Sequence, residues 1–100
     1  MNVKFQVVPH NQPTGVAFPV TVFVTSADKT ATVEISLSQA KGKAPTWTGA
    51  TKTVTTDGFG AAAVSFDVAL NGPCVAYLTA TAYVAASDAY DVDTEPVTVV

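Results

Sequence analysis

Apolar and polar residues alternate with a period of two along most of this chain. Residues 17–25 place apolar side chains at every second position, and residues 31–38 repeat the pattern. Successive side chains of a β-strand point to opposite faces, so both segments are predicted to be strands with one buried face. The turn formers at 26–29 lead us to predict that the two strands pair as a hairpin. The positions predicted to point inward are Phe18, Val20, Val22, Val24, Val33, Ile35 and Leu37.

The stretch 57–84 carries the strongest strand signal. Its first part alternates Val64, Phe66 and Val68 with polar residues, as in a sheet that is packed on one side. Turn formers at 71–73 separate this part from residues 75–84, whose two alternating rows both lack charge. A strand without charge on either face is typical of the centre of a sheet, so 75–84 is predicted to be a central strand.

Three further strands complete the pattern. Residues 3–8 form a first strand that ends at Pro9, and residues 51–56 form a short strand before a turn at 57–60. A turn over 85–91 leads to a last strand that ends with residues 96–100. Seven strands at this spacing in 100 residues predict one all-β domain, residues 1–100, with the strands arranged as a Greek-key sandwich.

Two segments carry a resemblance to a known family. TTDGFGAAAVSF, residues 55–66, resembles the aspartate, turn glycine and alternating strand of bacterial and phage immunoglobulin-like domains of the Big type, and YLTATAY, residues 77–83, is similar to their closing strand. The resemblance implies an immunoglobulin-like Greek-key β-sandwich of about seven antiparallel strands in two sheets. The immunoglobulin disulfide is absent, because Cys74 is the single cysteine.

Charge is scarce in this chain. Charged residues make up 13% of the sequence, against about 25% in a typical soluble domain, and there is no arginine. Five lysines against eight carboxylates form no basic stripe, which argues against a nucleic acid partner. No apolar run has the length of a membrane span, and the first ten residues contain no apolar core of a signal peptide. We therefore expect no nucleic acid, no membrane and no export signal.

The predicted topology sorts the loops to two ends. The loops 26–30, 57–60 and 85–91 share one end, where they bring four carboxylates toward each other: Asp28, Asp57, Asp88 and Asp91. The loops 10–15, 39–50 and 71–73 share the other end, which carries His10, Lys41, Lys43 and Trp47. A molecule polarised in this way orients its encounters with partners.

Candidate chemistry is sparse. The acidic segment around Asp88, Asp91 and Asp93 matches no defined calcium loop, and we interpret it as a solvated turn. His10 has no second histidine or cysteine at metal-ligand spacing, and Cys74 is predicted to be a small buried apolar residue. No nucleophile, base and orienting group come together. We predict no enzyme activity, no metal and no cofactor.

The predicted partner-binding residues are Trp47, Lys41, Lys43 and Tyr90. Tryptophan is enriched at interface hot spots, so an exposed Trp47 would be an anchor for a partner. The interpretation that we favour is that Trp47 folds back as a lid on an open end of the sandwich. A third reading is that an exposed Trp47 stacks on a sugar, although no second aromatic residue is near it in the sequence.

Few charges leave much of the surface to alanine, threonine and valine, as in proteins that live in an assembly. Together with the resemblance, this predicts a non-catalytic structural or interaction module of a phage virion, either a capsid decoration or cement protein or a tail-associated domain. Its predicted partners are other capsid or tail proteins, with further copies of the chain left open, and its predicted location is the virion, assembled in the host cytoplasm. The alternative is an adhesive or spacer immunoglobulin-like domain at a bacterial cell surface.

Overall fold

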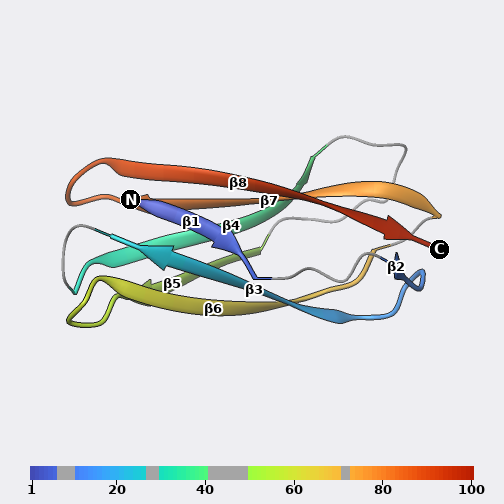
Figure 1. Ribbon diagram of the computed structural model, residues 1–100, viewed down its shortest axis with the longest axis horizontal. Helices are drawn as coiled ribbons and strands as arrows, with labels where there is room; N and C mark the ends of the chain where they lie inside the picture. Colours follow the sequence, from blue (N-terminus) through green and yellow to red (C-terminus); the bar gives the residue numbers. More distant parts are fainter. Residues whose placement is uncertain (7–10, 27–29, 41–49, 71–72) are drawn as a thin grey trace.

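The structure is a computed structural model that describes residues 1–6, 11–26, 30–40, 50–70 and 73–100, leaving aside the side chains of Gln39, Ala40 and Cys74. Its strands form two sheets that lie face to face in an elongated molecule (Figure 1). The prediction of an all-β fold with two sheets is confirmed. The described part contains no helix, and so none that is long and apolar enough to cross a membrane.

Eight strands occur in the described residues, not seven. The bounds are β1 Asn2–Phe5, β2 Asn11–Gln12, β3 Phe18–Thr25, β4 Thr32–Ala40, β5 Ala50–Thr55, β6 Ala61–Val68, β7 Cys74–Val84 and β8 Ala89–Val99. One sheet has the order β1-β3-β6, and the other has the order β2-β8-β7-β4-β5. All described pairings are antiparallel except that of β2 with β8. The unpredicted strand is β2, whose two polar residues show no alternating pattern.

The core lies between the sheets and is built from the predicted apolar rows. Its largest fully buried side chains include Phe66, Ile35, Leu37, Leu70 and Leu78. Burying each such side chain contributes about 1.5–3 kcal/mol relative to exposure. The inward row of β7 also contains three fully buried alanines, at 76, 80 and 82, whose small side chains leave room for larger ones from the opposite sheet.

The uncharged strand β7 lies at the centre of the five-stranded sheet, between β8 and β4, as predicted. The predicted inward row of β4 is also confirmed, because Val33, Ile35 and Leu37 are fully buried. In β4, the alternation of apolar and polar side chains therefore identified the buried face.

The predicted hairpin between residues 17–25 and 31–38 is wrong. β3 pairs with β1 and β6, whereas β4 pairs with β5 and β7 in the other sheet. The chain crosses from one sheet to the other between these strands, so their apolar rows face each other across the core. A strand with one apolar face is buried equally well beside its neighbour or opposite it, and the period of two does not distinguish these arrangements.

The predicted turn over 85–91 is also wrong at its end, because β8 begins at Ala89. Val84 pairs with Ala89, so the hairpin closes with a loop of residues 85–88. Asp88 has a φ of 54° in this loop, the left-handed conformation that aspartate tolerates better than most residues. Tyr90 and Asp91 consequently lie in a strand.

The two sheets are joined at two places, which we call seams: β1 lies beside β8 at the first seam, and β5 lies beside β6 at the second. At each seam, side chains of one sheet form hydrogen bonds with the backbone of the other. At the first seam, Asp91 and Asp93 of β8 accept hydrogen bonds from the backbone N–H groups of Val3 and Phe5 in β1, at 2.8 and 3.0 Å. At the second, Lys52 of β5 donates to the carbonyl oxygen of Ser65 in β6 at 2.5 Å. The Lys52 ammonium also lies 5.2 Å from the centre of the Phe66 ring.

Candidate interaction site

The outer face of the five-stranded sheet is nearly free of charge. We call it the tyrosine face. Cross-strand register assigns its residues, since directly opposed residues point to the same side. Among the described residues of this face, Glu34 carries the one charged side chain. The face comprises Thr32, Glu34, Ser36, Ser38, Thr51, Thr53, Thr55, Val75, Tyr77, Thr79, Thr81, Tyr83, Tyr90, Val92, Thr94, Pro96 and Thr98.

Three tyrosines and two valines give this face its exposed apolar area. Tyr90 is 71% exposed, and Tyr77, Tyr83, Val75 and Val92 are each exposed by more than a third. Tyrosine is enriched and charge is depleted at the centre of protein interfaces. The tyrosine face shares these two features, exposed tyrosines and little charge, with the centre of protein interfaces.

Hydrogen bonds between hydroxyl groups order two places on the tyrosine face. The side chains of Ser36 and Thr51 share a hydrogen bond of 3.1 Å, and those of Thr79 and Thr94 share one of 3.2 Å. Each bond joins neighbouring strands. A surface whose side chains are already held in place loses less conformational entropy when a partner binds.

Tyr83 lies among two carboxylates and a second aromatic ring. It pairs with Tyr90 of β8 on one side and with Glu34 of β4 on the other. Its hydroxyl donates to Asp88 Oδ1 at 3.0 Å. The pKa of Tyr83 is raised above its ordinary value of 10.0, first by this hydrogen bond, then by the charge of Asp88, by partial burial and by the charge of Glu34.

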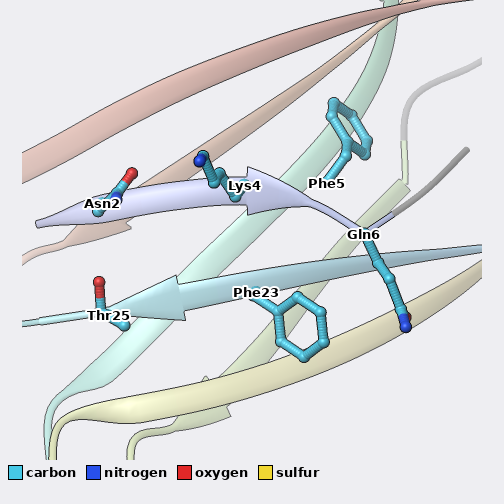
Figure 2. A pocket seen from close by; sticks show the side chains of 6 residues that line it. All are labelled: Asn2, Lys4, Phe5, Gln6, Phe23 and Thr25. Carbon is cyan, nitrogen blue, oxygen red and sulfur yellow. The ribbon is translucent and has the colours of Figure 1, made fainter.

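The outer face of the three-stranded sheet has a different character. Phe23, which is 44% exposed, separates two shallow hollows of about 390 and 440 Å³. Figure 2 shows the side chains around the first hollow, which come from β1, from Gln6 just after it, and from β3. Alanines of β6 and Asp57 line the second. Lys4 and Asp67 place charges of both signs on this side of the molecule.

The turn between β5 and β6 is organised by Asp57. Its Oδ1 accepts hydrogen bonds from the N–H groups of Phe59 and Ala61, at 2.8 and 3.0 Å. These bonds, the one from Ala61 first, lower the pKa of Asp57 below its ordinary value of 3.8. The turn holds Phe59 in solvent with 92% of its side chain exposed.

Of the carboxylates predicted for the acidic end, Asp57 and Asp88 lie in turns and Asp91 lies in β8, and the three make separate hydrogen bonds. Figure 1 shows the β5–β6 and β7–β8 connections at the same end of the sandwich. Asp57 binds its own turn, Asp88 accepts from Tyr83, and Asp91 accepts from Val3 across the seam. Within the described ranges, no three histidine, cysteine, aspartate or glutamate side chains form a group that would hold a metal ion.

Of the predicted partner-binding residues, Tyr90 is described, and it lies exposed on the tyrosine face. Trp47, Lys41 and Lys43 lie outside the described residues, as do His10, Asp28 and the side chain of Cys74. Tyr83 and Glu34 were not among the predicted partner-binding residues. The uncharged row of residues 75–83 contains Tyr83, and only the pairing of β4 with β7 places Glu34 beside it.

Comparison with protein-family models gives no match to this chain, and comparison with curated proteins gives none either.

Proposed function

We propose that this chain is a non-catalytic interaction module with an immunoglobulin-like Greek-key fold, and that it binds other proteins of a phage capsid or tail through its tyrosine face. The observation that carries the proposal is this face, in which the exposed tyrosines and valines of β7 and β8 lie beside ordered hydroxyl groups and Glu34 is the one described charge.

The strand order supports the immunoglobulin-like part of the proposal. In that fold, strands A, B and E share one sheet, and strands C, F and G share the other. If β1, β3 and β6 are read as A, B and E, then β4, β7 and β8 take the places of C, F and G. β5 then lies beside C, as the additional strand C′ does in variable-type domains.

The contrast between the two outer faces supports the choice of surface. The three-stranded sheet presents one exposed phenylalanine between Lys4 and Asp67, whereas the five-stranded sheet presents a broad aromatic and hydroxyl-rich surface. An extended apolar surface with little charge marks an interaction site more often than a scattered apolar residue does.

The test combines native particles with two matched variants. Val92 and Phe23 are both exposed apolar residues on strands, and they lie on opposite faces of the sandwich. We expect Val92→Lys to prevent incorporation into particles and Phe23→Lys to permit it. The measurement is the stoichiometry of the chain in purified particles by mass spectrometry, together with imaging of regular density on the shell or tail.

Equal incorporation of both variants would reject the tyrosine face as the interface. Recovery of the wild-type chain as a soluble monomer without particle association would reject the virion assignment. Recovery on the bacterial cell surface would instead support the adhesive or spacer role.

A further inference from the structure

The tyrosine face has a distinct site at the end nearest the β7–β8 turn. Glu34, Tyr83 and Tyr90 form one row across β4, β7 and β8, because Tyr83 pairs with both of the others. Asp88 joins them from the turn through its hydrogen bond with the Tyr83 hydroxyl. All four residues are exposed, so a ligand side chain reaches both rings and both carboxylates from solvent.

The described lysines lie away from this site. Lys4 points outward from the opposite sheet, and Lys52 lies over Phe66 at the β5–β6 seam. The Met1 ammonium interacts with Asp91, which points to the opposite face of β8 from its neighbour Tyr90. The row therefore combines two aromatic rings with the Glu34 carboxylate, and Asp88 adds a second carboxylate from the turn. The hydrogen bond with Asp88 is the largest cause of the raised pKa of Tyr83, and the charge of Glu34 adds to it.

We propose that Tyr83, Tyr90, Glu34 and Asp88 bind an arginine side chain of the partner protein. This inference rests on the proposed function and adds the chemistry of the partner to it. The face of a tyrosine ring attracts a cation, and a planar guanidinium stacks on the ring while its N–H groups donate to carboxylates. The chain already uses the simpler form of this contact, where Lys52 lies over Phe66.

Charge distinguishes this ligand from others that stack on aromatic rings. A neutral sugar or a planar amide gains the ring contact but not the attraction to Glu34 and Asp88. The probe is therefore the peptide acetyl-Gly-Arg-Gly-amide, and its control is the same peptide with citrulline, which keeps the planar shape of arginine and removes its charge.

The experiment is a titration of the isolated wild-type chain followed by NMR. With the arginine peptide, we expect chemical shift changes centred on residues 34, 83, 88 and 90. With the citrulline peptide, we expect affinity to be lower by about two- to fivefold or more, the range for an exposed cation–π contact. Equal affinities for the two peptides, or shift changes centred elsewhere, would overturn the proposal.

Substitutions test whether the arginine peptide binds at the row of Glu34, Tyr83 and Tyr90. Tyr90→Ala and Glu34→Gln change exposed side chains, and each should weaken the arginine peptide. Tyr77→Ala removes a tyrosine from the other end of the same face and should leave the affinity unchanged. If Tyr77→Ala weakens the peptide as much as Tyr90→Ala does, the proposed site is wrong.

The titration and the particle experiment fail independently. The peptide is tested on the chain alone, so a negative titration rejects arginine as the ligand. It leaves open whether the tyrosine face binds other proteins of a particle. Arginine binding in the titration combined with no particle association would reject the virion role and keep the site.

Discussion

Asp91 and Val3 are joined by a hydrogen bond of 2.8 Å across the two sheets, although they stand 88 positions apart in the sequence. The Asp91 carboxylate accepts from the backbone N–H of Val3 on the side of β1 that faces away from β3. Asp93 repeats the contact with Phe5. The last strand thus holds the first strand through side chains.

Removing this bond should loosen β1. We expect Asp91→Ala to lower the melting temperature and to speed hydrogen exchange at the Val3 and Phe5 amides several-fold, because β1 is an edge strand paired only with β3 in the described structure. Asp67→Ala, at an exposed position of β6, is the control and should change neither measurement. Unchanged exchange at Val3 in Asp91→Ala would show that the side chain does not hold the strand.

Lowering the pH should destabilise the folded state, because the Asp91 carboxylate becomes protonated. The N–H of Val3, followed by that of Val92, lowers the pKa of Asp91 below its ordinary value of 3.8. A carboxylate whose pKa is lower in the folded state stabilises that state fully above its unfolded pKa, and the contribution disappears as pH falls through the folded pKa. Asp57 adds a contribution of the same sign.

We therefore expect the melting temperature to fall below about pH 4, and to fall less steeply in Asp91→Asn and in Asp57→Asn. Asp67→Asn serves as the control and should follow the wild-type curve. The measurement is thermal unfolding by circular dichroism across an acidic pH series. If the Asp91→Asn and wild-type curves run parallel, Asp91 is not one of the groups responsible.

The buried hydroxyl of Thr56 should matter more than its size suggests. Its Oγ1 accepts from the backbone N–H of Ala31 at 2.7 Å, and the Thr56 side chain is 2% exposed. Thr56→Val keeps the shape but leaves that N–H without its acceptor, so we expect a loss of about 1–3 kcal/mol in the free energy of unfolding.

Denaturant unfolding measures this loss, with Thr53→Val as the control, since Thr53 is exposed on β5. The control should stay within about 0.5 kcal/mol of wild type. Equal effects of the two substitutions would mean that a water molecule or a backbone shift satisfies the Ala31 N–H.

Lys52 should stabilise the second seam. Lys52→Met keeps the aliphatic stem but removes both the bond to the Ser65 carbonyl and the charge over Phe66, so we expect a loss of about 1 kcal/mol. Lys4→Met, which removes a lysine from the outer face of β1, should have a smaller effect. Chemical denaturation of both variants compares them directly, and a larger effect at Lys4 would contradict the assignment.

The alternation of apolar and polar residues was enough to predict most of the strands. It has this power because one side of each sheet packs against the other sheet, while the other side faces solvent. It did not predict which sheet each strand joins. Phe18 to Val24 and Val33 to Leu37 follow the same pattern whether their strands are neighbours or face each other, and the structure places them in different sheets. The tertiary packing makes this choice.

The candidate site was predicted only in part for a related reason. Tyr90 was singled out, but its neighbours depend on the register of the β7–β8 hairpin. A turn extending to residue 91 would have left Tyr90 outside any strand. The observed loop of residues 85–88 pairs Tyr90 with Tyr83 and brings Glu34 into the same row.

The seam contacts also bear on how readily the sheet edges of this protein would pair with another chain. The outer edge of a β-strand offers backbone groups to any strand that approaches, which is a common route to aggregation. At β1, two N–H groups of that edge are already occupied by Asp91 and Asp93, and at β6 one carbonyl is occupied by Lys52. Because these partners are charged and belong to the same chain, an incoming strand would have to displace them and leave their charges poorly solvated. A sandwich with few charges thus places three of them where uncontrolled strand addition would otherwise begin.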